Sequence, residues 1–108
     1  MPNIIIKGMN ITDVKKISKQ MVDDLAMITA CPREYFSIEV VESNFVSDGD
    51  IILKDPFIQV NWFDRGQQVQ DQTAAAITQH IKNAGYKEVE IFFIILERNN
   101  YYENGKHL

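Results

Sequence analysis

The sequence has little of what builds disulfides, metal sites or nucleic-acid interfaces. Its 108 residues include one cysteine, Cys31, which excludes an intramolecular disulfide and fits a reducing cytoplasm. The two histidines, His80 and His107, lie far apart without cysteine partners, so we expect no zinc site and no cofactor. With 11 basic and 15 acidic residues the net charge is −4, and no basic stripe is visible, which argues against nucleic acid as a partner.

Long apolar runs are missing as well. No run is long enough to cross a membrane, and Lys7 interrupts the first short one, so we expect neither a membrane contact nor a signal peptide. Hydrophobic residues make up 45% and charged residues 24% of the chain, as in ordinary globular proteins. We therefore expect a single domain over residues 1–108, located in the cytoplasm.

The chain repeats one order of elements in its two halves. Pro2 leads a short strand, a helix with apolar residues three and four apart follows over 11–28, and a second strand runs over 36–42. Asn10 or Thr12 is the expected N-cap of this helix, and Cys31 with the following proline ends it.

The second half restarts at Pro56, which lies 54 positions after Pro2. A strand over 57–63, a helix marked by apolar positions over 69–84 and a strand over 89–96 are expected there. Residues 43–55, with a turn at Asp48-Gly49-Asp50, are expected to be a plain connection. The halves 2–55 and 56–108 are therefore predicted to be duplicated βαβ units.

Two such units predict an α/β (α+β) fold with a four-stranded mixed sheet and both helices on one face. The last strand is apolar on both faces from Ile91 onward, which is typical of strands buried on both sides. Because no helix is left for the second face, we expect further copies of the chain to cover it. A ferredoxin-like βαββαβ domain has the same element order, and it would suit a regulatory module.

Pro2 is the first candidate for chemistry. An aminopeptidase that removes Met1 would leave a free prolyl amine, and a nearby apolar wall would lower the pKa of that amine. A neutral amine near pH 7 suits proton abstraction from a carbon beside a carbonyl group. The alternative is that proline at this position reflects only N-terminal processing.

Several segments carry a resemblance to a known superfamily. They are the Pro2-led strand with its repeat at Pro56, the junction ACPREYFSIEVV over 30–41, and the motifs WFDRG over 62–66 and NYYENG over 100–105. Together they resemble the tautomerase superfamily, in its macrophage migration inhibitory factor-like branch, and most closely a bacterial family of unknown function within it. The resemblance implies a homotrimer with sites between subunits, in which Pro2 isomerises a small, anionic keto or enol substrate.

The chain departs from that superfamily where other branches hold cations. Cys31 stands where the migration-factor branch has a lysine, and Glu39 stands where oxalocrotonate-type members have an arginine. Their second arginine falls near Asn10, and the tyrosine and asparagine of the migration factor's last strand fall on Glu90 and Phe92. The resemblance therefore implies the base and leaves the substrate open.

Arg65 is the candidate partner for an anionic substrate, because a guanidinium can hold a carboxylate through two hydrogen bonds. The alternative is a surface residue paired with Asp64. The remaining candidates have a structural alternative beside the functional one. Phe63, Tyr35 and Tyr102 are either substrate-binding aromatics or packing residues, and Glu39 and Glu90 are either barrel-facing carboxylates or solvated charges. Cys31 is either a nucleophile or a small buried residue, and His80 is expected to be a packed, hydrogen-bonded histidine.

The leading hypothesis is thus a tautomerase acting on a small keto or dicarbonyl acid, with Pro2 as general base. One alternative is a catalytically silent trimer of the same fold that binds a small ligand or a protein. The other is an unrelated ferredoxin-like regulatory module.

Overall fold

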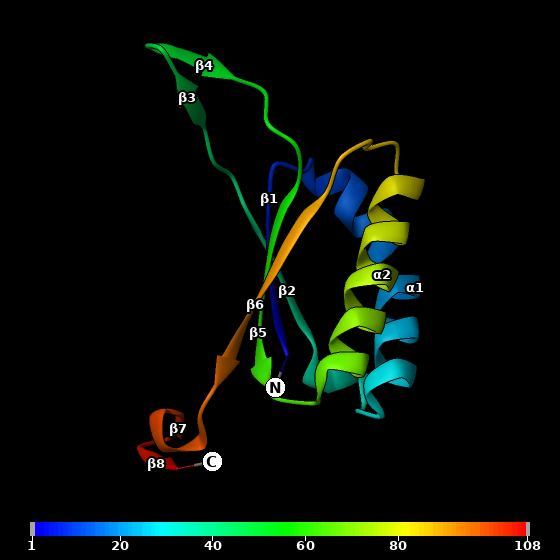
Figure 1. Ribbon diagram of the computed structural model, residues 1–108, viewed down its shortest axis with the longest axis vertical. Coiled ribbons are helices and arrows are strands. Elements are labelled where there is room, and N and C mark those ends of the chain that lie inside the picture. The colour runs from blue at the N-terminus through cyan, green and yellow to red at the C-terminus, as the bar shows by residue number, and fades with distance from the viewer. Residues whose placement is uncertain (1, 108) are drawn as a thin grey trace.

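The protein is a two-layer domain in which two helices cover one face of a sheet (Figure 1). The computed structural model describes residues 2–107, so the removal of Met1 that the proline mechanism needs falls outside the described residues. Within that range the main elements are β1 Asn3–Lys7, α1 Ile11–Thr29, β2 Ser37–Val41, β5 Phe57–Phe63, α2 Gln67–Asn83 and β6 Glu90–Leu96.

The strand order of the main sheet is β2-β1-β5-β6. β1 pairs with β2 in parallel and β5 with β6 in parallel, while β1 and β5 run antiparallel. The two strands of each βαβ unit are therefore direct neighbours, and the predicted pair of βαβ units is confirmed. The ferredoxin-like alternative is wrong, because that fold splits its βαβ units by inserting another strand between the parallel pair.

The core lies between the sheet and the helices. Alternate residues of the central strands β1 and β5 point toward the helices and are buried, as the strand period of two requires. The largest buried side chains are those of Trp62, Ile4, Ile6, Met21, Leu25, Ile58, Ile77 and Ile81. Trp62 is 1% exposed and is therefore a packing residue of this core.

The first helix begins where the sequence predicts, after Asn10. The Asn10 side chain caps α1 by accepting a hydrogen bond from the Thr12 backbone N–H at 2.8 Å. After Thr29 the chain turns through Ala30, whose φ is 55°, and this turn brings Cys31 to the end of the sheet layer. Gly66, with φ 85°, precedes α2.

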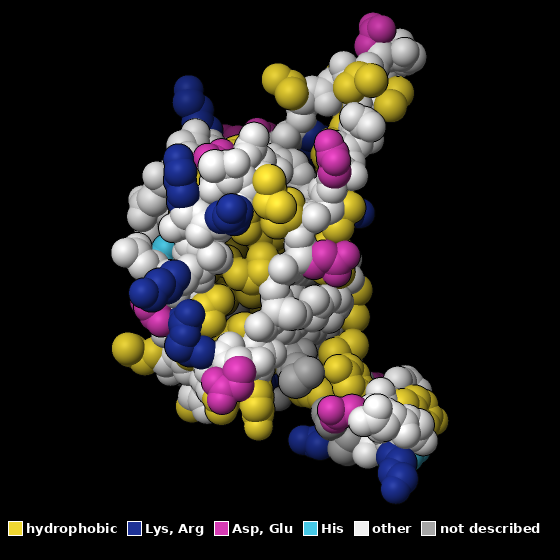
Figure 2. All heavy atoms as spheres, turned by 180° about the vertical axis from the view of Figure 1, so that it is seen from behind, with side chains coloured by type: hydrophobic (Ala, Val, Ile, Leu, Met, Phe, Trp, Pro, Cys, Tyr) yellow, Lys and Arg dark blue, Asp and Glu magenta, His cyan; other side chains and the backbone are white. Residues whose placement is uncertain are grey.

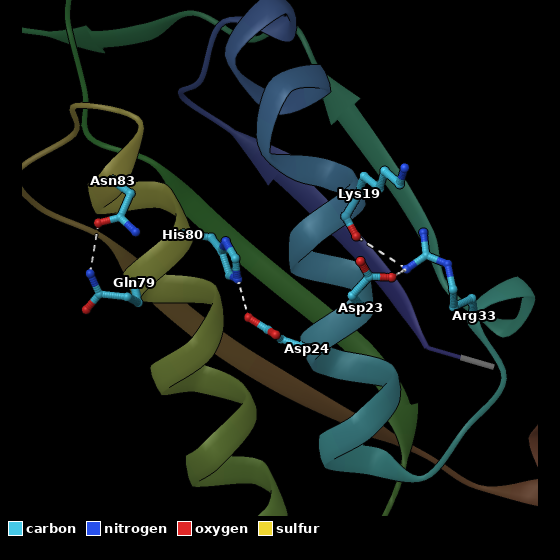
Figure 3. A network of polar contacts seen from close by, with 7 residues as sticks. All are labelled: Lys19, Asp23, Asp24, Arg33, Gln79, His80 and Asn83. Carbon is cyan, nitrogen blue, oxygen red and sulfur yellow. Dashed lines mark hydrogen bonds and ion pairs between the residues drawn. The ribbon is translucent and has the colours of Figure 1, made fainter.

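The helices are also joined by polar contacts (Figure 3). His80 Nε2 of α2 lies 2.6 Å from Asp24 Oδ2 of α1, which confirms the prediction of a packed, hydrogen-bonded histidine. Arg33 of the short 3-10 helix η1 (Arg33–Tyr35) pairs with Asp23 and donates to the Lys19 carbonyl. The Arg33 contacts hold the segment after α1 against α1.

No helix among residues 2–107 is long and apolar enough to span a membrane.

Residues 43–55 connect the two units around the predicted turn, but they also contain two short strands that the sequence did not predict. This segment forms a hairpin of β3 (Phe45–Ser47) and β4 (Asp50–Ile52) around the predicted turn, and it projects from one end of the sheet (Figure 1). Its strands are too short for a period of two to show in the sequence. Hydrophobic side chains lie along it (Figure 2), and Val46 and Ile51 are 67% and 73% exposed.

The opposite end of the sheet carries the C-terminal segment. After β6 the chain forms a 3-10 turn, η2 (Arg98–Asn100), and a small hairpin of β7 (Tyr102–Glu103) and β8 (Lys106–His107). The sequence motif NYYENG supplies this hairpin, with its turn at Asn104 and Gly105, both at positive φ. This segment lies at the end of the sheet where β1 begins and β5 ends (Figure 1).

Candidate functional site

A cavity of about 650 Å³ lies where β5 and β6 end. Four separate segments meet there: the residue after α1, the turn η1, the loop between β5 and α2, and the segment after β6. The residues lining the cavity are Cys31, Tyr35, Phe63, Asp64, Arg65, Arg98 and Glu103. It therefore combines cations, carboxylates, aromatic rings and a thiol in one space.

Arg65 is fixed on three sides within this cavity. Its Nη1 donates to the Phe63 carbonyl at 2.9 Å, its Nη2 donates to Cys31 Sγ at 3.1 Å, and its guanidinium lies 5.1 Å from the centre of the Trp62 ring. The neighbouring Asp64 instead accepts a hydrogen bond from the Gly66 backbone N–H at 2.8 Å. The structure thus gives no support to the surface pair of Arg65 with Asp64.

Cys31 is partly exposed, and it is not the inert buried residue favoured by the sequence interpretation. Burial raises the pKa of its thiol, but hydrogen bonds with Arg65 and Thr29 and the charge of Arg65 outweigh burial, so the pKa lies below its ordinary value of 9.0. The amino-terminal charge acts in the same direction. The activating group could not be seen in the sequence, because Arg65 is 34 positions away.

Pro2 is one of the fully buried residues, with less than 2% of its surface exposed. Its carbonyl accepts a hydrogen bond from the Ser37 backbone N–H at 3.0 Å, which ties it to the start of β2. In the antiparallel pair of β1 and β5, Asn3 lies opposite Asn61, so Pro2 comes just before the first paired residue, at the end of the sheet where β5 finishes. Pro2 is not among the residues that line the cavity.

Arg98 is a cavity residue that sequence reasoning missed. Its guanidinium lies 5.4 Å from the centre of the Phe63 ring. The Phe63 ring also contacts Tyr101, at 5.5 Å between ring centres. The available signal was position: Arg98 lies two residues after the end of β6, just as Arg65 lies two residues after the end of β5, and parallel neighbours end at the same edge of a sheet.

The predicted aromatic residues do not all gather here. Phe63 and Tyr35 line the cavity, as the substrate-wall hypothesis requires. Tyr102 lies in the C-terminal hairpin, is 60% exposed and stacks on His107 at 4.6 Å between ring centres, outside this lining. Glu39 and Glu90 are exposed on their strands.

A row of polar side chains crosses the open face of the sheet next to Pro2, and the sequence analysis did not find it. Asn3 donates to Ser37 Oγ at 2.9 Å, Asn61 donates to Asn3 Oδ1 at 3.2 Å, and Gln59 donates to Asn61 Oδ1 at 2.8 Å. Three of these residues line a hollow of about 360 Å³ with Leu96 and Tyr101. Strand alternation around the buried positions 4 and 60 is the signal that would have found them.

Comparison with known proteins gives a family and a fold. The family model described as "Domain of unknown function (DUF1904)" matches residues 1–107. A crystal structure of a DUF1904 domain from Sebaldella termitidis is 37% identical, with all of both chains covered and a TM-score of 0.93. A search of curated proteins finds no match to the chain.

More distant solved structures show the fold alone. The macrophage migration inhibitory factor-like protein of Entamoeba histolytica is 17% identical over 99% of this chain and 98% of its own, with a TM-score of 0.73. A fused 4-OT described as an asymmetric trimer is 11% identical over 97% and 94%, with a TM-score of 0.81.

Proposed function

Because the chain belongs to the DUF1904 family, a domain of unknown function with the fold of the tautomerase superfamily, we propose that it is a proline-based tautomerase. Its amine at Pro2 would move a proton on a small keto or enol acid. The observation that carries the proposal is that a buried Pro2 begins β1 at the same end of the sheet as the cavity of about 650 Å³ in which Arg65 lies against Trp62.

The chemistry follows from burial and charge. Desolvation disfavours the charged prolyl amine, so the neutral amine is available to take a proton from the carbon beside the substrate carbonyl. The electrons of that C–H bond form the enolate, which Arg65 stabilises while it holds the substrate carboxylate. The protonated Pro2 amine then returns the proton to another atom of the same substrate, so the reaction needs no cofactor.

The other predicted site residues take supporting roles. Phe63 and Tyr35 line the cavity and would form an apolar wall around a substrate held by Arg65. Tyr102 is turned away from the cavity of its own chain, and we propose that it reaches substrate only at a neighbouring subunit.

We propose a homotrimer as the working form. Support comes from the uncovered face of the sheet, on which Phe92 and Ile94 are 37% and 42% exposed, and from the apolar projecting hairpin. The fused 4-OT with the same fold is described as a trimer. The reducing bacterial cytoplasm is the proposed location, supported by the free Cys31 and by the bacterial relative of the same family.

The decisive experiment compares the parent with Pro2→Ala. Intact mass first establishes whether Met1 is removed from each protein, because a retained Met1 blocks the amine. Titration of the terminal nitrogen is expected to give a pKa well below that of an ordinary prolyl amine, and phenylpyruvate ketonisation is expected to fall by at least about tenfold in the variant. Equal turnover in two fully processed proteins rejects the mechanism.

Arg65 is tested separately by Arg65→Gln with Arg65→Lys as the matched control. Loss of the charge is expected to raise KM for phenylpyruvate, while lysine restores part of the affinity without the two-point hydrogen bonding.

The silent trimer is the second candidate, because Cys31 and Glu39 stand where the resembling branches hold cations. An ordinary amine pKa in a fully processed trimer would favour it.

A further inference from the structure

We infer that the Cys31 thiol and an anionic ligand compete for the Arg65 guanidinium, so that Cys31 sets the pH range over which the cavity binds anions. The inference rests on the proposed use of Arg65 as the anion partner, and it makes Cys31 a positioning residue of that site. It does not require Cys31 to react with a substrate.

The Arg65 guanidinium is the cation for which Cys31 and a bound anion would compete. Arg65 Nη2 donates to Cys31 Sγ at 3.1 Å, while Nη1 is occupied by the Phe63 carbonyl at 2.9 Å. The guanidinium is held against Trp62, so it cannot swing away to serve an anion elsewhere without losing these contacts. An anion that binds Arg65 in the cavity therefore shares the single positive charge of the guanidinium with Cys31, while the other N–H groups of the guanidinium can donate to the anion.

The protonation state of Cys31 decides how strong the competition is. A neutral thiol is a weak acceptor and leaves the positive charge of Arg65 available. A thiolate is a full negative charge at hydrogen-bonding distance, and it neutralises the guanidinium. Arg65 already lowers the pKa of the Cys31 thiol from 9.0, so the thiolate becomes populated closer to neutral pH than in an ordinary cysteine.

Linkage makes the effect reciprocal. If the thiolate weakens anion binding, a bound anion must raise the pKa of the thiol by the corresponding amount. A rise of one pH unit at saturating anion corresponds to about tenfold weaker binding by the thiolate form.

Other charged groups face the same space and must be separated from Cys31. Asp64 lies on the loop after β5, Arg98 and Glu103 come from the C-terminal segment, and Tyr35 comes from η1. Replacing Cys31 by serine keeps all of these groups and removes only the titrating sulfur.

The experiment uses pyruvate as the probe anion and the full chain as purified. Cys31 is the one cysteine in the sequence, so the rate of alkylation by the uncharged reagent iodoacetamide, followed by intact mass, reports on this thiol alone. The pH midpoint of that rate is measured with and without saturating pyruvate. Pyruvate affinity is measured in parallel from the fluorescence of Trp62, the one tryptophan, against which Arg65 lies.

Competition predicts an upward shift of the midpoint by about one unit with pyruvate, and pyruvate binding about tenfold weaker above the midpoint than below it. In Cys31→Ser the affinity should not change across the same pH range. In Arg65→Gln the midpoint should rise without pyruvate and should not respond to it. Arg98→Gln is the matched control, because Arg98 lines the cavity without contacting Cys31, and its midpoint should still respond to pyruvate.

The outcomes separate the inference from the proposed function. If pyruvate binds and lowers only the maximal alkylation rate, it blocks access to the thiol without competing for Arg65, and the inference is overturned while the anion site stands. A pH-dependent affinity that persists in Cys31→Ser overturns it as well. If pyruvate binds neither the parent nor Arg98→Gln, the Arg65 anion site itself fails, and the inference fails with it.

Discussion

Replacing Gly8 by alanine should destabilise the fold far more than the same change at Gly49. Gly8 ends β1 with φ +83°, and a Cβ there would lie 2.7 Å from the Asp55 carbonyl oxygen and 3.2 Å from Pro56 Cα. Gly49 has nearly the same φ, +84°, but nothing lies within 4 Å of its Cβ position. The pair therefore separates backbone strain from steric overlap.

The magnitude can be worked from these distances. Left-handed backbone in an alanine costs about 1–2 kcal/mol at either position. At Gly8 the overlap is with backbone, which cannot rotate away, and overpacking of this kind adds about 1–3 kcal/mol. Gly8→Ala should therefore lose about 2–5 kcal/mol of unfolding free energy, against about 1–2 kcal/mol for Gly49→Ala.

Thermal unfolding followed by Trp62 fluorescence checks this, at one protein concentration because assembly adds to apparent stability. For a domain of this size each kcal/mol lowers Tm by about 4–8 °C. Gly8→Ala should melt clearly below Gly49→Ala. Equal melting temperatures would refute the argument that the backbone next to Gly8, at Asp55 and Pro56, leaves no room for a Cβ.

Two further changes test the helix pair and the projecting hairpin. Tyr86 donates to Asp13 Oδ2 at 2.6 Å and accepts from the Asn10 backbone N–H at 3.1 Å, and Tyr86→Phe should lose about 1–2 kcal/mol in urea unfolding. Burial, together with the hydrogen bond to Asp13, raises the pKa of Tyr86 above 10.0. The stability that these contacts contribute is therefore complete below pH 10 and is lost as pH rises through the folded-state pKa. Tyr86→Phe should lack that alkaline loss of stability, and a variant with the same pH profile as the parent contradicts the assignment. Ile51→Ser with Leu53→Ser, both exposed in the single chain, should lower the sedimentation mass from trimer toward monomer at unchanged far-ultraviolet circular dichroism, and an intact trimer would show that the hairpin is free.

The main elements of the fold could be predicted from periodicity. The helix pattern from Ile11 to Ile28 and the strand Phe57–Phe63 agree with the observed elements to within a residue or two, because each spans enough residues for its period to show. The hairpin strands of two or three residues could not be found this way. The duplicated βαβ fold and a ferredoxin-like fold have the same element order and differ in which strands pair. Strand pairing is not visible in the sequence, so only the structure could decide between them.

The candidate site was only partly predictable for a different reason. Pro2 and Arg65 stood out by residue type and by position beside predicted strands. The partner of Arg65 did not, because Cys31 reaches it across the end of the sheet layer rather than along the chain. Glu103 was missed because it lies in the small C-terminal hairpin, which has no periodic pattern, whereas the position of Arg98 after β6 was a signal that was not used.

The location of a positive charge beside Cys31 is what an anion in the cavity is expected to need. The Arg65 guanidinium supplies such a charge from the loop after β5, with Nη2 at 3.1 Å from Cys31 Sγ. If location is what matters, Cys31→Lys combined with Arg65→Gln should recover most of the pyruvate affinity that Arg65→Gln loses, measured by Trp62 fluorescence. Recovery should stay incomplete, because an ammonium lacks the planar pair of donors. An affinity no better than that of Arg65→Gln alone would show that the guanidinium's fixed orientation against Trp62, rather than a charge at this point, is what the cavity requires.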